Sequence, residues 1–306
     1  MFLDYFPFII PLIFFPILIY HKQISNAIGL LDYPDKRKKH LLPIPKIGGI
    51  YIFVSCIFSI IFFLNIYNER LIFSFIVLVG GLFLIGFIDD KIEMKATSRL
   101  ILQFAVTAIA ISIDFNLNIE NLKFGTLDKN ILIYNGSNLF TIFCILVYMN
   151  AFNMFDGINL QSSLYSLLIF SIINIIFINS LFINILIISL VFFSYLNFKN
   201  KAFLGDSGSL LIAFIIGYIF IKLYNLNYIK FADEIVLYML IPGLDLIRLF
   251  IVRILKRKNP LKSDREHLHH LLIIRYSLIK TLLIIISLIN VPILLYYFGI
   301  NNLLSI

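Results

Sequence analysis

Long apolar stretches separated by short polar segments run through the whole chain. A helix needs roughly 20 apolar residues to cross the hydrocarbon core of a bilayer. Ten stretches carry almost no charge, and all but the short fourth and fifth approach this length: 2–20, 47–66, 71–88, 99–113, 139–149, 162–178, 181–198, 209–224, 234–252 and 277–298. Residues 131–134 either extend the fifth stretch or form an eleventh. The pattern predicts an all-α, polytopic integral membrane protein with ten or eleven transmembrane helices, in a single domain over residues 1–306.

The composition excludes the other broad classes of protein. Hydrophobic residues make up 60% of the chain, charged residues 14%, and the mean hydropathy is +0.97. A soluble chain of 306 residues cannot bury so many apolar side chains, because too much of a globule is surface. Disorder requires the opposite balance of low hydrophobicity and high charge.

The basic residues indicate the orientation in the membrane. If the first stretch enters from outside, the inner loops are 21–46, 89–99, 150–161, 199–208 and 253–276. These loops, with Arg248 and Lys280 in adjoining spans, hold 20 of the 25 Lys and Arg residues of a chain with net charge +8. Cytoplasmic loops carry such an excess. Both termini are therefore expected outside and the loops with candidate chemistry in the cytosol.

Acidic residues follow the third stretch. Asp89 and Asp90 are adjacent, and Glu93 comes shortly after them. Mg²⁺ takes hard oxygen ligands, commonly one or two carboxylates together with phosphate oxygens. Adjacent carboxylates repel one another, so a cation stabilises them. The alternative is a solvated loop at a helix end.

The loop between the fifth and sixth stretches is polar without being basic. It contains Asn150, Asn153, Asp156 and Gly157. Amide and carboxylate groups recognise hydroxyls and imide edges in a fixed geometry. A polar turn with Asp-Gly as its turn residues is the alternative.

Asp206 lies between two glycines where the eighth stretch begins. A helix N-terminus with glycines lets free backbone N–H groups approach a phosphate, and the acid is placed to hold a metal bridging to it. An N-cap role for Asp206 is the alternative, and the two are compatible.

Three of the five histidines, His267, His269 and His270, lie within the five residues after Arg265. A zinc site is disfavoured, because adjacent residues diverge by about 100° on a helix. A phosphate-binding cluster with the neighbouring basic residues explains them better. A basic loop attracted to anionic lipid explains the Lys and Arg residues but not the histidines.

The first inner loop carries a second basic run. Lys38, His40 and Lys46 are candidate phosphate contacts, and the prolines and glycines of residues 43–49 favour a fixed shape. Inside the ninth stretch, Asp245 and Arg248 share one helix face, either as a structural ion pair or in contact with substrate.

The orientation came from Lys and Arg alone, yet it places all these acids and histidines on the inner side. Together with a membrane-embedded body, they predict phosphoryl transfer to a lipid phosphate, with Mg²⁺ and basic groups offsetting the repulsion between two anions.

The motifs, in their order, resemble those of the bacterial polyprenyl-phosphate N-acetylhexosamine-1-phosphate transferases of glycosyltransferase family 4. The resemblance covers nearly the whole chain and rests on residues 37–49, 86–90, 150–157, 203–209, 242–248 and 265–270. It is closest to the N-acetylglucosamine-type, O-antigen-initiating branch. It implies transfer of a sugar 1-phosphate from a UDP-N-acetylhexosamine to undecaprenyl phosphate, releasing UMP and beginning a cell-surface polysaccharide.

The resemblance also implies residue roles and partners. Asp89 and Asp90 match paired acids that bind metal or position and deprotonate the lipid phosphate, and Asp206 matches an acid that binds Mg²⁺, with Mn²⁺ as a substitute. Nucleotide-sugar contacts fall on Asn153 and Asp156, and donor contacts on the three histidines. A multi-pass protein of the bacterial inner membrane, as a homodimer without a nucleic-acid partner, is expected.

The chain departs from the family pattern after Asp156-Gly157. A second acid and a second glycine are common there, and this chain has Asn159 and Leu160. A catalytically inactive member of the family is therefore one alternative. A secondary transporter of an anionic substrate is another, although such proteins concentrate polar groups near the midplane of the membrane.

Overall fold

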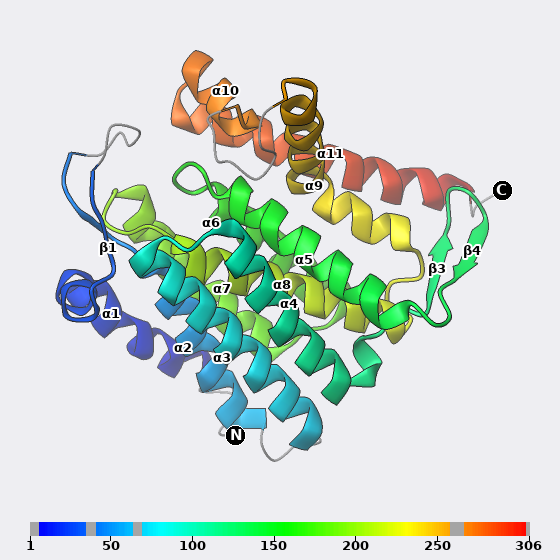
Figure 1. Ribbon diagram of the computed structural model, residues 1–306, viewed down its shortest axis with the longest axis horizontal. Helices are drawn as coiled ribbons and strands as arrows, with labels where there is room; N and C mark the ends of the chain where they lie inside the picture. Colours follow the sequence, from blue (N-terminus) through cyan, green and yellow to red (C-terminus); the bar gives the residue numbers. More distant parts are fainter. Residues whose placement is uncertain (1–5, 35–40, 64–68, 258–265, 304–306) are drawn as a thin grey trace.

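The computed structural model describes residues 6–34, 41–63, 69–257 and 266–303, and within them the chain is mostly helical (Figure 1). The elements are α1 (Phe6–Ile28), β1 (Leu31–Asp32), β2 (Ile44–Pro45), α2 (Gly48–Phe63), α3 (Glu69–Ile92), α4 (Ala96–Ile113), η2 (Phe115–Leu117), β3 (Asn121–Phe124), β4 (Lys129–Leu132), α5 (Ser137–Phe155), α6 (Gln161–Ile172), η3 (Ile173–Phe177), α7 (Leu181–Phe198), α8 (Gly205–Asn225), α9 (Ala232–Leu255), α10 (Leu268–Arg275) and α11 (Leu278–Leu303).

Seven helices in the described residues are long and apolar enough to cross a membrane: α3, α4, α5, α7, α8, α9 and α11. Shorter apolar helices cover Gly48–Ile60 and Gln161–Phe177. Each of the ten apolar stretches contains a helix. The prediction of a helical, multi-pass membrane protein is confirmed, while the number of ten crossings and the outer placement of both termini stay predictions.

Residues 131–134 are not part of a span. β3 and β4 pair as an antiparallel hairpin, with Asn121 opposite Leu132 and Phe124 opposite Lys129. All four side chains of β4 are exposed. An apolar run of this length cannot cross a bilayer, and pairing with β3 satisfies its backbone instead.

The loop expected over 150–161 begins later than predicted. Asn150 and Asn153 belong to the last turns of α5, which ends at Phe155. Phe152 and Phe155 are buried against Tyr165 of α6, with ring centroids 5.6 and 5.5 Å away. This apolar face continues the helix past the polar residues of the other face.

α8 is the central helix of the bundle, and it packs against α2, α3 and α5 (Figure 1). Every residue from Ser207 to Gly217 is buried. Glycines of neighbouring helices allow this close packing. A Cβ atom added to Gly86 of α3 would overlap the backbone of Ser207, and one added to Gly49 of α2 would overlap its side chain.

We expect Gly86→Ala to lower the free energy of unfolding by about 1–3 kcal/mol, because the backbone of α8 cannot move without shifting its other contacts. Gly80→Ala on the same helix is the matched control, since no described atom beyond its chain neighbours and the adjoining backbone of its own helix lies within 4 Å of its added Cβ. That control should be neutral or slightly stabilising. Thermal unfolding in detergent measures both, and equal midpoints for the two variants would contradict the close packing.

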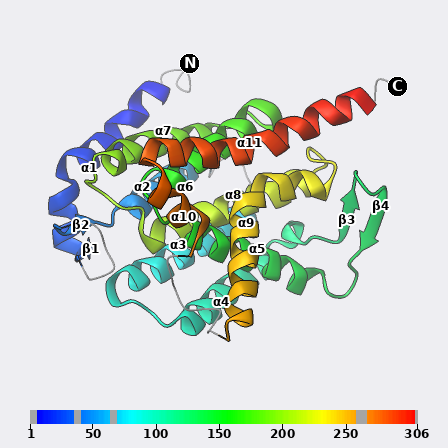
Figure 2. The same ribbon diagram turned by 90° about the horizontal axis from the view of Figure 1, so that it is seen from above.

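The two small sheets mark opposite ends of the molecule. β1 and β2 lie at one end and the β3–β4 hairpin at the other, as both views show (Figures 1 and 2). The C-terminal ends of α3 and α5 and the N-terminal end of α8 meet toward the end with β1 and β2, where the predicted site residues gather.

Candidate active site

A cavity of about 350 Å³ lies where these helix ends meet. Five predicted site residues line it: Lys46, Asp90, Asn153, Asp156 and Asp206. They come from four separate segments of the chain. With Asp32, the lining contains four carboxylates and a single lysine, so the cavity favours a bound cation.

Asp90 joins α3 to the start of α8. Its Oδ1 atom accepts the N–H of Asp206 at 3.0 Å, and Oδ2 accepts the N–H of Ser207 at 3.0 Å and its hydroxyl at 2.8 Å. Gly205 has a φ of +75°, a backbone conformation that suits glycine at this approach. The Asp90 side chain is only 1% exposed. It caps the positive end of the α8 dipole from a neighbouring helix.

Asp206 presents its carboxylate to the cavity. Its side chain is 30% exposed, and Oδ1 accepts a hydrogen bond of 2.5 Å from Asn153 Nδ2. Arg99 Nη1 lies 3.6 Å from the same oxygen. Oδ2 has no hydrogen-bond partner among the residues that the structure describes. Asp206 therefore offers the cavity an oriented and accessible oxygen.

Asp89 does not line the cavity, and Arg99 Nη1 lies between it and Asp206. Asp89 accepts the N–H of Met94 at 2.6 Å and an Arg99 Nη1 contact at 2.7 Å, and its side chain is 4% exposed. Neighbours on a helix point about 100° apart, so Asp89 and Asp90 cannot face the same side. Asp89 holds the turn between α3 and α4, and Glu93 in that turn is exposed.

The cavity fits a magnesium ion only in part. Within the described residues, no group of three or more His, Cys, Asp or Glu side chains is arranged to hold a metal. Mg²⁺ commonly binds one or two carboxylates and completes its shell with water and phosphate oxygens. Burial, with added repulsion from Asp206 and Asp90, raises the pKa of Asp156 to about 7. A cation held by Asp206 and Asp156 would relieve this repulsion.

Lys46 supplies the positive charge of the lining. Its Nζ atom lies 3.5 Å from both Asp32 Oδ1 and Asp90 Oδ1. Burial alone would lower the pKa of Lys46, but the charges of Asp90, Asp32 and Asp206 outweigh it and raise the pKa. The ammonium is therefore protonated at neutral pH. The pairing of β1 with β2 brings Asp32 to it.

Asp245 and Arg248 hold the histidine segment. Asp245 accepts hydrogen bonds from His267 Nδ1 at 2.8 Å and from the N–H of Leu268 at 3.1 Å. Arg248 Nη2 donates to Asp245 Oδ1 at 2.8 Å and to the carbonyl of Glu266 at 2.6 Å. The Asp245–Arg248 ion pair therefore has a structural role, because it fixes the start of α10.

His269 reaches the loop that carries Asp156. A Cβ atom added to Gly157 would overlap its Nε2 atom, and Gln161 Nε2 lies 3.4 Å from its Nδ1 atom. Burial, with the neighbouring His270 and His267, lowers the pKa of His269 to about 3. Its imidazole is therefore neutral at physiological pH, and it can offer an N–H group but not a charge. The rings of His267 and His270 lie 5.4 and 4.3 Å from it.

Other predicted residues lie outside the cavity lining. Asn150 donates to Gln103 Oε1 at 3.1 Å and to the carbonyl of Leu146 at 2.8 Å, so it joins α5 to α4. Lys38, His40 and Arg265 lie outside the described residues.

The two departures from the family pattern have distinct structural roles. Asn159 lines the cavity and donates to the carbonyl of Asn197 at 3.0 Å and to Asn200 Oδ1 at 2.5 Å. Leu160 has a φ of +69°, which disfavours a side chain and suits the glycine common at this position. Its N–H donates to Asn197 Oδ1 at 2.6 Å.

Sequence reasoning missed several residues of the site: Asp32, Arg99, Gln161 and Asn197. Asp32 carried a signal, because it is an acid four residues before the basic run that begins at Lys36. The others gain their positions from contacts between distant segments.

The chain is similar in sequence to known proteins. The model of glycosyl transferase family 4 matches residues 72–224, half of the 306 residues. The matched part runs from α3 to α8 and includes Asp90, Asn153, Asp156 and Asp206.

Three relatives carry related names. The undecaprenyl-phosphate alpha-N-acetylglucosaminyl 1-phosphate transferase of Salmonella typhi is 26% identical over 262 residues, 82% of this chain and 71% of that protein. The protein of the same name from Escherichia coli (strain K12) is 25% identical over 267 residues, covering 83% and 72%. A probable undecaprenyl-phosphate N-acetylglucosaminyl 1-phosphate transferase of Bacillus subtilis is 26% identical over 259 residues, covering 81% and 71%. The resemblance is confirmed, and the chain belongs to glycosyl transferase family 4, as an enzyme of the transferase type.

Proposed function

We propose that the protein transfers an N-acetylhexosamine 1-phosphate from a UDP-sugar to undecaprenyl phosphate at the cytosolic face of a bacterial inner membrane. A phosphate oxygen of the lipid attacks the β-phosphorus of the UDP-sugar and forms a new P–O–P linkage. The bond from this phosphorus to the oxygen that bridges to the α-phosphate breaks, and UMP leaves with that oxygen. The lipid-linked sugar diphosphate begins a cell-surface polysaccharide such as O-antigen.

The accessible Asp206 carboxylate at the end of a buried central helix is the observation that carries this proposal. It shares a cavity with Lys46 and with Asp156. Phosphoryl transfer needs alignment and compensation of charge more than covalent participation by the protein. The names of the relatives, which include undecaprenyl phosphate and a 1-phosphate transfer, support this pair of substrates.

Several residues in and beside the cavity have roles in the proposed reaction. Asp206 and Asp156 are placed to hold Mg²⁺, or Mn²⁺ in its stead, which when bound neutralises charge on the transferred phosphoryl group. Lys46 binds a phosphate oxygen through its ammonium group. Asn153 fixes the orientation of the Asp206 carboxylate. Asp90 holds the start of α8 in position, and Asp245 does the same for His267.

A panel of UDP-sugars tests the proposal. Membranes with the protein are incubated with undecaprenyl phosphate, Mg²⁺ and each of UDP-N-acetylglucosamine, UDP-N-acetylgalactosamine and their 6-deoxy analogues. A lipid-linked sugar diphosphate should form with at least one donor and be absent from membranes without the protein. Binding of the donors without turnover, in folded protein, would contradict the proposal. It would favour an inactive member, for which Asn159 and the strained Leu160 are the structural grounds.

Removal of divalent cations is expected to stop the reaction. Four carboxylates and one lysine line the cavity, so phosphate groups enter against a net negative charge unless a cation is present. EDTA should reduce the rate to background, and added Mg²⁺ or Mn²⁺ should restore it. The unfolding midpoint measured in parallel separates loss of the cation from loss of the fold. An undiminished rate in EDTA would rule out the assigned roles of Asp206 and Asp156.

A further inference from the structure

A second and larger cavity, of about 780 Å³, lies at the end of α8 opposite Asp206. Its volume is within the range of about 300–1,000 Å³ that ligand pockets span. The last turns of α8, the start of α3, the start of α7, η2 and β3 contribute to its walls. The 21 residues of α8 extend about 30 Å at 1.5 Å per residue, so the two cavities lie at opposite ends of a helix long enough to cross a membrane. None of the residues assigned to phosphate transfer lines it.

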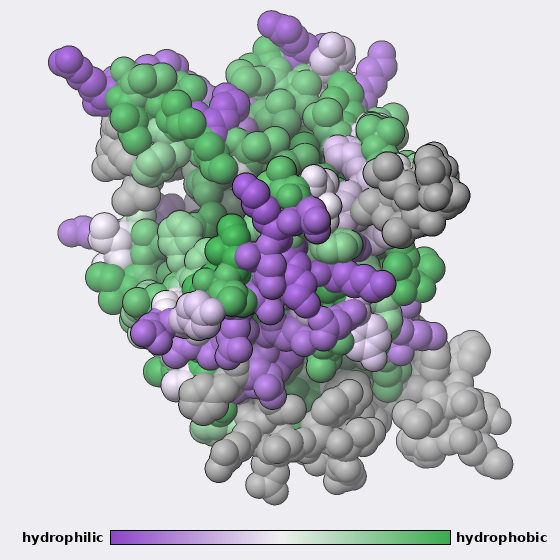
Figure 3. Space-filling model, turned by 90° about the vertical axis from the view of Figure 1, so that its right-hand side faces the viewer, coloured by the Kyte–Doolittle hydropathy of each residue, from purple (hydrophilic) through white to green (hydrophobic). Residues whose placement is uncertain are grey.

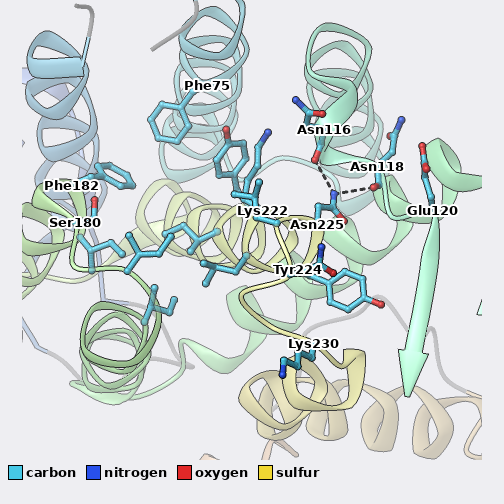
Figure 4. Close-up of a pocket in the computed structure, with 18 of the residues that line it drawn as sticks. Phe75, Asn116, Asn118, Glu120, Ser180, Phe182, Lys222, Tyr224, Asn225 and Lys230 are labelled. Carbon is cyan, nitrogen blue, oxygen red and sulfur yellow. Dashed lines mark hydrogen bonds between the residues drawn. The ribbon is translucent and has the colours of Figure 1, made fainter. Parts of the chain in front are cut away.

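The walls of this cavity divide into an apolar and a polar part (Figure 4). Phe75 and Phe182 lie on one side, with their ring centroids 5.6 Å apart, and Phe75 is also 5.6 Å from Tyr218. Asn116 and Asn118 lie on the other side, beyond Lys222 and Asn225 (Figure 4). A soluble ligand would leave the apolar wall uncovered, whereas an amphiphile matches both parts.

The polar part carries a positive charge. Three lysines, Lys123, Lys222 and Lys230, and one acid, Glu120, line it. Lys222 is paired with the buried Asp114 at 2.6 Å. Lys123 and Lys230 are exposed and have no ion-pair partner within the part of the chain that the structure describes. Two cationic groups are therefore available to an anion.

The polar wall is also held in shape. Asn225 Nδ2 donates to the carbonyls of Asn116 and Asn118, at 2.8 and 3.0 Å. Asn118 Oδ1 is buried without a hydrogen-bond partner among the described residues. This acceptor suits a hydroxyl of a bound headgroup, because a buried acceptor without a partner costs free energy.

The end of the molecule that carries the β3–β4 hairpin shows hydrophilic side chains gathered in its middle, with hydrophobic ones around them (Figure 3).

We propose that this cavity binds an anionic phospholipid from the leaflet opposite the active site, with an acyl chain along Phe75 and Phe182 and the phosphate at Lys123 and Lys230. The assignment of the leaflet rests on the proposed orientation, while the binding itself does not. The shared chemistry of the ligand is a phosphate group, and attachment to an acyl chain distinguishes the lipid from a free phosphate ester.

The chain contains no tryptophan, so a single introduced tryptophan reports on one position. Phe75→Trp places this reporter in the apolar wall. The full-length variant is reconstituted in phosphatidylcholine vesicles that contain a small fraction of acyl-brominated lipid. Brominated phosphatidylglycerol should quench the tryptophan at a several-fold lower fraction than brominated phosphatidylcholine. Phe143→Trp, on the 63% exposed Phe143 of α5, is the matched control and should show no headgroup preference.

Charge removal identifies the contact. Lys123→Gln and Lys230→Gln should each weaken the preference for phosphatidylglycerol by about fivefold. Lys129→Gln is the control, because this exposed lysine of β4 does not line the cavity. Folding is checked by the thermal unfolding midpoint rather than by transferase activity, so failure of the proposed function leaves this test intact. If Phe75→Trp does not fold, Phe182→Trp serves as the reporter.

Three results would overturn the proposal. Equal quenching by the two brominated lipids would show that the cavity does not recognise an anionic headgroup. No quenching by either would show that no acyl chain enters. Loss of the preference on addition of soluble glycerol 3-phosphate would identify a site for free phosphate esters instead.

Discussion

Asp206→Asn is expected to lower the rate of sugar 1-phosphate transfer by at least about 100-fold, the usual cost of losing one charge-stabilising group in an active site. Asparagine retains an oxygen to accept the hydrogen bond from Asn153, so the start of α8 should keep its structure. The negative charge that holds the cation is lost. Transfer rates and unfolding midpoints of purified wild type and variant measure the two effects separately.

Asp128→Asn is the control for this variant, because Asp128 is exposed in the hairpin at the other end of the molecule. Its rate should equal that of the wild type. A rate near the wild-type value for Asp206→Asn would show that another group holds the cation, and the assignment of the cavity would then be wrong.

Asp90→Ala is expected to cost about 3–5 kcal/mol of folding free energy as well as activity, because it breaks a buried charged interaction from one side. The N–H groups of Asp206 and Ser207 would lose their acceptor, and Lys46 would lose one of its two carboxylate partners. A large drop in the thermal unfolding midpoint, together with loss of transfer, is the predicted result.

Asp90→Asn sharpens this test. The amide keeps the shape of the side chain but turns one acceptor oxygen into a donor that faces the donors of Ser207 or Asp206. We therefore expect an intermediate loss of stability, unlike the unchanged midpoint of Asp206→Asn. Wild-type stability in both Asp90 variants would exclude the capping role of Asp90 and leave a purely chemical one.

The helical fold class was predictable from the sequence, because a long apolar segment in a membrane must satisfy its own backbone hydrogen bonds, and a helix does so. The distribution of basic residues also predicts that Asp90, Asn153, Asp156 and Asp206 lie on one side of the membrane, and in the structure these four residues line one cavity. The polar residues after 149 predicted a loop, but α5 continues to Phe155. Its buried Phe152 and Phe155 face the core while the polar residues lie on the other face of the helix.

The division of work between neighbouring acids was not predictable from the motif. Asp89 and Asp90 are the same residue type, yet their side chains point in different directions from α3. Asp89 accepts a hydrogen bond from Arg99, whereas Asp90 accepts hydrogen bonds from the start of α8. Arg99 and Asp32 were missed for a related reason. Asp32 meets Lys46 from the other side of the first inner loop, and Arg99 lies beside Asp206 of the distant α8, so no local spacing indicates these contacts.

The central claim is that the phosphate next to the sugar moves to the lipid together with the sugar. UDP-N-acetylglucosamine, or the best donor of the panel, labelled with ³²P at the β-phosphate is incubated with undecaprenyl phosphate and the purified protein. We predict that the label enters the lipid product in equal proportion to the sugar, while label at the α-phosphate is released as UMP. Label from the β-phosphate that stays in water-soluble UDP while the sugar enters the lipid would contradict the account.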